Sequence, residues 1–124
     1  MIVDDSPVIR KVGSRIISDL GFSVVEAASG FEGLERARNA MPDAMLVDWD
    51  LAGMSGLEFM AELSKNPDAR NCKVLYCTSE IMISEMTKAK RAGADGFLMK
   101  PFNREIVTHK LLEAGVIDKI PEAA

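Results

Sequence analysis

AMLVDWDLAGMSG, residues 44–56, is the part of the sequence from which the architecture follows most directly. It opens with Ala44–Asp48, a short apolar run that ends in a carboxylate, as expected of a strand covered on both faces. Ser55 and Glu58 have the spacing of a capping box, which predicts a helix directly after the loop. A buried strand followed by a helix is the repeating unit of parallel sheets.

The same alternation extends to both ends of the chain. Further strands are predicted at Met1–Asp4, Val24–Ala27, Lys73–Cys77 and Gly96–Met99. Helices are predicted from Ser6-Pro7 to Gly21, after Ser29, over Ile83–Ala92, and from Asn103 to Gly115. The first helix is expected to bury one apolar stripe, made of Val8, Val12, Ile16, Ile17 and Leu20. This order predicts an α/β fold, (βα)5, with a parallel sheet, right-handed crossovers and helices on both faces.

Composition limits the kind of protein. The 124 residues fit one domain, and 48% of them are hydrophobic and 27% charged, as in ordinary globular proteins. With 15 basic and 19 acidic side chains the net charge is −4, which argues against nucleic acid as a direct partner. No apolar stretch approaches the roughly 20 residues of a membrane span, and no secretion signal opens the chain. We therefore expect a cytoplasmic protein in which Cys72 and Cys77 are reduced thiols.

Polar residues stand at the predicted strand ends, where open parallel sheets bind their ligands. They are Asp4, Asp5, Asp48, Thr78 and Lys100. Converging carboxylates raise one another's pKa unless a cation neutralises them, and an all-oxygen pocket suits Mg²⁺. A carboxylate beside a metal ion and a lysine is well placed to attack phosphorus, because both cations stabilise the transferring oxygens.

Four motifs give the chain a specific resemblance. Asp4-Asp5-Ser6, the stretch Asp48–Gly56, Thr78-Ser79 and Lys100-Pro101-Phe102 resemble the motifs of the receiver domains of two-component response regulators. The resemblance covers residues 1–115 and is closest to stand-alone regulators of the chemotaxis type. It implies a flavodoxin-like sheet in the order 2-1-3-4-5. It also implies that residues 116–124 form a short tail with no effector domain.

The resemblance also implies roles for individual residues. Asp48 would accept a phosphoryl group, and Mg²⁺ would be held by Asp5, by Asp48 and by the backbone carbonyl of Asp50. Asp4 would reach the ion through water, and Lys100 would pair first with the carboxylate and then with the phosphoryl oxygens.

A switch and a set of partners follow from the same resemblance. Thr78 would turn to the phosphate, Phe97 would move inward behind it, and the Lys100–Pro101 bond would be cis. The helix at 83–92, the fifth strand and the fifth helix would then bind a separate protein. The phosphoryl donor would be a histidine kinase or a histidine phosphotransfer protein. Such a protein catalyses its own phosphorylation without being a metabolic enzyme, and is a monomer or a phosphorylation-dependent dimer.

Other functions stay open at this point. Asp48-Trp49-Asp50 has the D-x-D form of haloacid-dehalogenase-type phosphatases, although it follows the third strand and not an early one. A flavin-binding module would share the fold, but it needs a phosphate-cradling turn where this chain has Asp4-Asp5. A phosphate sink, or a receiver-like binding module without phosphoryl control, would share every motif. Two features depart from the family pattern: the first strand is short, and Ala52 stands where proline is usual.

Overall fold

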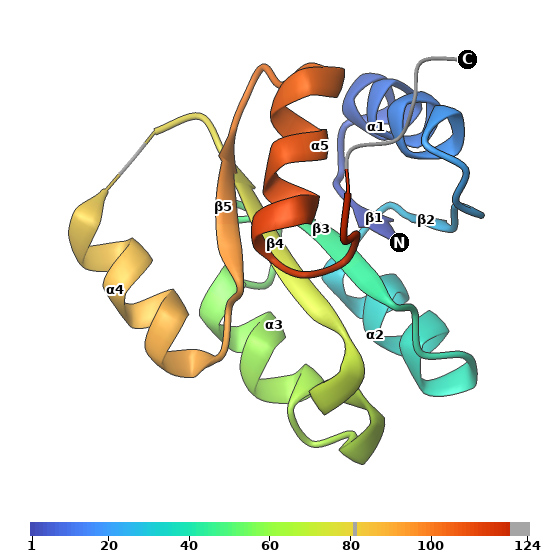
Figure 1. Cartoon of the computed structure of the whole chain (residues 1–124). Coiled ribbons are helices and arrows are strands. Elements are labelled where there is room, and N and C mark those ends of the chain that lie inside the picture. The colour runs from blue at the N-terminus through green and yellow to red at the C-terminus, as the bar shows by residue number, and fades with distance from the viewer. Residues whose placement is uncertain (81, 120–124) are drawn as a thin grey trace.

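The computed structural model describes residues 1–80 and 82–119, and within them five strands alternate with five α-helices (Figure 1). The strands are β1 (Ile2–Val3), β2 (Glu26–Ala27), β3 (Ala44–Asp48), β4 (Lys73–Thr78) and β5 (Gly96–Met99). The helices are α1 (Pro7–Asp19), α2 (Gly30–Asn39), α3 (Gly56–Leu63), α4 (Ile83–Ala92) and α5 (Arg104–Glu113). A short 3₁₀ helix, η1 (Pro67–Asn71), precedes β4 and was not predicted.

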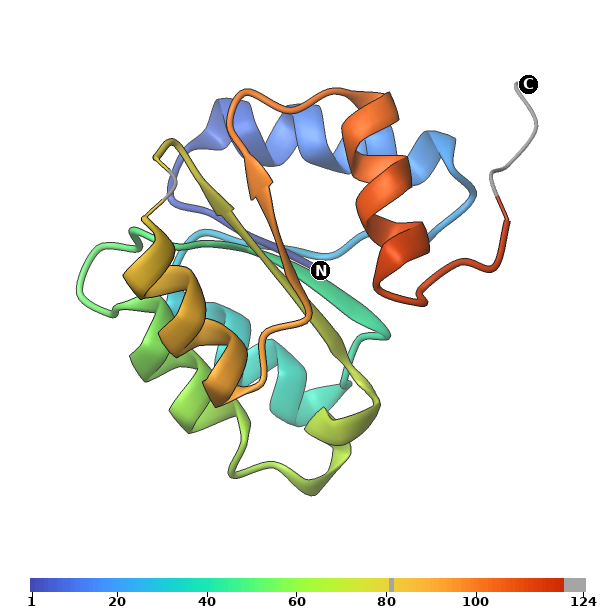
Figure 2. The same ribbon diagram turned by 60° about the vertical axis from the view of Figure 1, so that its left-hand side comes forward.

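All neighbouring strands are parallel, and their order is β2-β1-β3-β4-β5. This confirms the doubly wound, flavodoxin-like fold. Helices α1 and α5 cover one face of the sheet, and α2, α3 and α4 cover the other (Figure 2). Successive residues of β3 serve the two faces in turn, since Leu46 belongs to one core cluster and Met45 and Val47 to the other.

The predicted helix starts are confirmed in detail. The hydroxyl oxygens of Ser6, Ser29 and Ser55 accept backbone hydrogen bonds three residues on, at 3.3, 3.0 and 3.1 Å. Asn103 caps α5 in the same way, through a 2.9 Å bond from the Ile106 amide. Each cap satisfies an N–H group that the helix itself leaves without a partner, so helix starts sit where the sequence placed them.

The predicted apolar stripe of α1 is wrong at two positions. Val8 and Val12 are 69% and 44% exposed, and the helix instead packs through a face that contains Ile9, the buried Gly13 and Ile16. The reason is a close approach at Gly13, where an added Cβ would lie 2.9 Å from Cδ1 of Ile2. Because glycine has no apolar side chain, it does not mark the buried face in the sequence. The apolar pattern therefore predicted a neighbouring face of the helix.

The strands at one side of the sheet are shorter than predicted. β1 pairs two residues with β2 and two with β3, whereas β3 and β4 share five pairs and β4 and β5 share four. Beyond β1, the ammonium group of Met1 donates to the Ala44 carbonyl at 2.8 Å. Residues 120–124 of the expected tail lie outside the described residues. No described helix is long and apolar enough to span a membrane.

Candidate functional site

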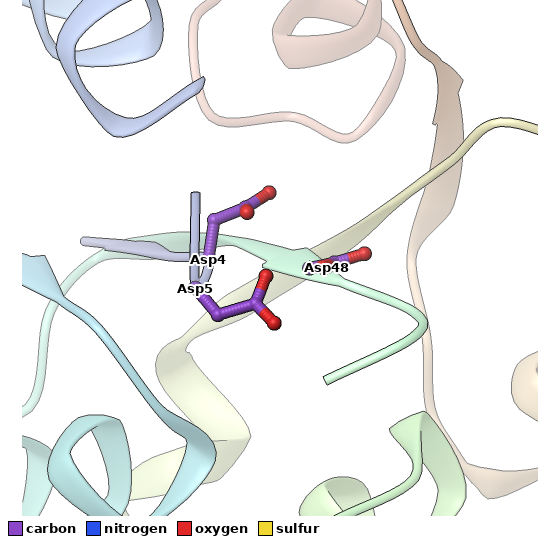
Figure 3. A group of neighbouring side chains, drawn as sticks. All are labelled: Asp4, Asp5 and Asp48. Carbon is purple, nitrogen blue, oxygen red and sulfur yellow. The ribbon is translucent and has the colours of Figure 1, made fainter. Parts of the chain in front are cut away.

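Three carboxylates meet at the carboxyl edge of the sheet (Figure 3). Asp4 and Asp5 follow β1 and Asp48 ends β3, and these two strands are paired neighbours, so their ends arrive side by side. One oxygen from each carboxylate lies within 4.8 Å of the others. Asp4 and Asp48 are only 2% and 6% exposed, while Asp5 faces solvent. The cluster is therefore an acidic pocket, open on the side of Asp5.

Lys100 supplies the positive charge that the pocket needs. Its Nζ lies 2.8 Å from Oδ2 of Asp4 and 3.1 Å from Oδ1 of Asp48. Burial lowers the pKa of Lys100, but its hydrogen bonds to Asp4 and Asp48 outweigh that effect, and the net pKa is raised. The side chain therefore remains a cation. The Lys100–Pro101 peptide bond is cis, as expected.

Asp48 combines burial with a directed set of hydrogen bonds. Burial raises its pKa above the ordinary value, and the backbone amide of Asp50 and the Lys100 ammonium oppose that rise. The Asp50 amide donates to Oδ1 at 3.1 Å, the same oxygen that faces Lys100. Among the described residues both donors thus reach Oδ1, which leaves Oδ2 for a new bond.

Asp4 is more fully engaged than Asp5. Its Oδ1 accepts the Ser6 amide at 2.9 Å and its Oδ2 accepts Lys100 at 2.8 Å. Each oxygen of Asp4 therefore already accepts one hydrogen bond. Asp5 and Asp48 are the more available carboxylates, and a set of hard oxygen ligands in a pocket of high negative charge fits Mg²⁺.

The residues predicted to form the switch also lie beside the pocket. The hydroxyl of Thr78 donates to the Glu80 carbonyl at 2.9 Å and accepts the Glu80 amide at 3.2 Å, so it points to its own loop. Phe97 is only 9% exposed, with its ring centre 5.9 Å from that of Trp49. A pocket of about 500 Å³ lies between these side chains. Thr78 and Phe97 therefore line one pocket together with Trp49 and Asp50, the two residues that follow Asp48.

Two contacts behind the site were not predicted. The hydroxyl of Tyr76 donates to the Gly56 carbonyl at 2.7 Å, which ties β4 to the start of α3. The Trp49 ring lies directly on Gly56, where an added Cβ would come within 2.2 Å of it. Buried tyrosine hydroxyls need a partner, so Tyr76 signalled such a bond without identifying the acceptor.

The cysteines take no part in the site. Cys72 and Cys77 are free and buried, and burial raises their pKa values to about 11 and about 12. Protonated thiols are poor nucleophiles and poor metal ligands, so these two side chains are unsuited to the chemistry of the site.

Comparisons with known proteins agree with this geometry. The family model of the response regulator receiver domain matches residues 1–112. Chemotaxis protein CheY-3 of Vibrio cholerae is 29% identical over 112 residues, which are 90% of this chain and 86% of that protein. Chemotaxis protein CheY of Pseudomonas aeruginosa is 28% identical over 90% of each chain. The structure of V. cholerae CheY4 superposes with a TM-score of 0.85 at 33% identity, covering 91% of this chain and 94% of that one.

Proposed function

Because this chain belongs to the response regulator receiver domain family, a family of two-component signalling proteins, we propose that it is a switch operated by Mg²⁺-dependent phosphorylation of Asp48. The observation that carries the proposal is the environment of that carboxylate. Oδ1 of Asp48 is held by Lys100 and by the Asp50 amide, and two further carboxylates stand within 4.8 Å. One oxygen remains for the bond to phosphorus.

The proposed reaction is a direct transfer to Asp48. Oδ2 forms a bond to phosphorus while the bond from phosphorus to the donor's leaving atom breaks, and the electron pair of that bond departs with the donor. Lys100 stabilises the charge on the transferring oxygens. The donor is a histidine kinase or a histidine phosphotransfer protein, and the leaving atom is then an imidazole nitrogen.

Mg²⁺ would be held by Asp5, by Asp48 and by the backbone carbonyl of Asp50, with Asp4 acting through water. The exposure of Asp5 and the two hydrogen bonds that Asp4 already accepts support this division of roles. When bound, the ion supplies positive charge to the phosphoryl oxygens and relieves the repulsion among the carboxylates.

The proposed output is a change in protein binding. A phosphoryl group offers charge-assisted hydrogen bonds worth about 1.5–3 kcal/mol each, enough to draw the Thr78 hydroxyl from the Glu80 carbonyl. Phe97 would move with it, and the α4-β5-α5 surface would then bind a separate protein. Exposed apolar side chains on this surface support a protein partner; they are Met82, Ile83 and Met99.

We further propose that residues 1–115 form the switch domain, acting in the cytoplasm as a monomer or as a phosphorylation-dependent dimer. The protein would catalyse its own phosphorylation and dephosphorylation. Asp50 and Glu80 would set the lifetime of the phosphoryl group, because both line the pocket beside Thr78 that a hydrolytic water would enter. An unchanged dephosphorylation rate in Asp50→Asn would contradict that role.

The test uses Trp49, the only tryptophan, as a fluorescent reporter next to Asp48. Mg²⁺ is added first and acetyl phosphate second, with Asp48→Asn as the matched variant and mass spectrometry as the second readout. We expect a saturable change with Mg²⁺, followed by one added phosphate in the wild type and none in the variant. Absence of both the metal response and the added mass would overturn the proposal. Multiple turnover of phosphate esters would indicate a phosphatase instead.

A further inference from the structure

Arg10 joins three elements behind the acidic cluster, although it contacts none of the three carboxylate groups. It lies in the first half of α1, and its Nη1 donates to the backbone carbonyl of Asp4 at 2.7 Å. Its Nε lies 3.3 Å from Oε1 of Glu26 on β2. The Arg10 side chain is 18% exposed. One guanidinium therefore ties α1 to the end of β1 and to the neighbouring strand.

The contact falls at a point where the sheet gives little support. β1 ends at Val3, and beyond it the Asp4 amide still donates to the Ala27 carbonyl at 3.1 Å. The next group along the chain is the Asp4 carbonyl, which is the acceptor of the Arg10 bond. Arg10 thus provides the hydrogen bond to the first backbone group beyond the strand pairing of β1.

Holding this carbonyl also orients Asp5. The peptide group between Asp4 and Asp5 is planar, so a fixed carbonyl oxygen fixes the plane that carries the Asp5 nitrogen and Cα. The Asp5 side chain starts from that Cα, is exposed, and makes no hydrogen bond or ion pair within the part of the chain that the structure describes. The direction of the Asp5 carboxylate therefore depends on its backbone.

The ion pair with Glu26 makes the positive charge of Arg10 compatible with a nearby metal ion. A bare cation behind the pocket would repel a divalent cation, but Glu26 places a negative charge 3.3 Å from the guanidinium. The planar fork of arginine can direct two nitrogens to two acceptors at once, which a lysine ammonium on a flexible stem does less well.

We propose that Arg10 is a positioning residue for the metal-binding carboxylates, because it holds the Asp4 carbonyl so that Asp5 points into the pocket. Glu26 neutralises the positive charge of Arg10. This rests on the proposed Mg²⁺-dependent function and adds a residue outside the acidic cluster on which that function depends. It predicts that a lysine at this position, equal in charge, is a poor replacement.

The test compares Arg10→Lys with wild type and with Lys11→Met, which removes the exposed neighbouring cation. Mg²⁺ affinity is measured by Trp49 fluorescence, and the amide resonances of Asp5 and Ser6 are recorded by NMR in metal-free protein. We expect Arg10→Lys to weaken Mg²⁺ binding at least fivefold and to shift both resonances. Lys11→Met should change neither by a comparable amount.

The possible outcomes distinguish a failure of the inference about Arg10 from a failure of the proposed Mg²⁺-dependent function. Unchanged Mg²⁺ affinity and unshifted resonances in Arg10→Lys, even with lower thermal stability, would show a merely structural role and overturn the inference. A wild type that binds no Mg²⁺ would overturn the proposed function and this inference with it. Should Arg10→Lys fail to fold, Glu26→Gln removes only the other arm of the fork. A two- to threefold loss of Mg²⁺ affinity in Glu26→Gln then supports the inference, and an unchanged affinity overturns it.

Discussion

The two sides of the sheet are built differently, and the site lies across the line between them. β3, β4 and β5 are joined by five and four residue pairs, whereas β1 shares only two with each neighbour. The well-paired side consists of β3, β4 and β5, and it supplies Asp48, Thr78 and Lys100. The short-stranded side consists of β1 and β2, and it supplies Asp4 and Asp5. The groups proposed to react are therefore held by strand ladders, and the carboxylates beside them depend on side-chain bridges.

The short-stranded side also packs less completely at its far end. A pocket of about 410 Å³ opens at the amino edge of the sheet, next to Met1 and Ile2. Two side-chain bridges hold the opposite edge, from Arg10 to the Asp4 carbonyl and from Lys100 to the Asp4 carboxylate. Cooperative strand pairing gives the most protected parts of a fold, so this side should open more readily than β3-β4-β5.

Removing Lys100, which bridges the two sides of the sheet, should lower the free energy of unfolding more than any other change considered. Lys100→Met removes the cation that contacts Asp4 and Asp48 and leaves two nearly buried carboxylates unpaired. Loss of one partner of a buried ion pair typically costs about 3–5 kcal/mol, and we expect about 3 kcal/mol because the pocket is open on one side. Urea unfolding at pH 7 in metal-free buffer measures this loss.

The matched control is Lys65→Met, which removes an exposed cation 2.9 Å from Glu62. Exposed pairs of this kind contribute about 0–1 kcal/mol, so stability should change little. Equal effects of the two substitutions would mean that Lys100 does not join the two sides of the sheet.

The strand bounds can be predicted from the sequence more accurately on the well-paired side than on the short-stranded side. Ala44–Asp48 and Gly96–Met99 were predicted at their observed bounds, because nearly continuous apolar runs mark strands that are covered on both faces. On the other side, the predicted Met1–Asp4 and Val24–Ala27 shrink to two residues each. Alternation of residue types gives the register of a strand, but its length depends on neighbours that are distant in the sequence.

The site divides in a related way. The motifs placed Asp4, Asp5 and Asp48 together correctly, since parallel strands bring their carboxyl ends to one edge. The bridges from Arg10 to Asp4 and from Tyr76 to Gly56 could not be predicted, because each depends on where a long side chain finds an acceptor after the chain has folded. The roles of Thr78 and Phe97 remain predictions.

A substitution on the well-paired side sharpens the comparison. Tyr76→Phe removes a buried hydroxyl and leaves the Gly56 carbonyl without its 2.7 Å partner. An unsatisfied buried acceptor costs about 1–3 kcal/mol, and we expect about 2 kcal/mol from chemical unfolding. The start of α3 should loosen, while hydrogen exchange in β1 and β2 stays close to that of the wild type. A loss of protection confined to β1 and β2 would contradict the division into two sides.

Mg²⁺ should act most strongly on the short-stranded side. An ion that binds only the folded protein stabilises it by about 1.4 kcal/mol at ten times its dissociation constant. Because Asp5 follows β1, the ion should slow hydrogen exchange of the amides in β1 and β2 more than that of the amides in β4. Asp5→Asn should remove both effects, and a uniform slowing across the sheet would argue against a metal site that links the two sides.

The smallest effect expected is a pH-dependent one at Asp48. Burial raises its pKa in the folded protein, so the stability from this group is complete below the ordinary value of 3.8 and is lost as the pH rises through the raised pKa. Asp48→Asn avoids that loss, because an amide does not ionise, and Lys100 keeps Asp4 as a partner at 2.8 Å. In metal-free buffer the variant should gain stability relative to wild type between pH 4 and pH 7, by an amount on the order of 1 kcal/mol. Asp118→Asn, which removes one carboxylate at an exposed position, is the matched control. A variant that is less stable than wild type at pH 7 would mean that the pairing of Asp48 with Lys100 outweighs its burial, and that the well-paired side also relies on a side-chain bridge.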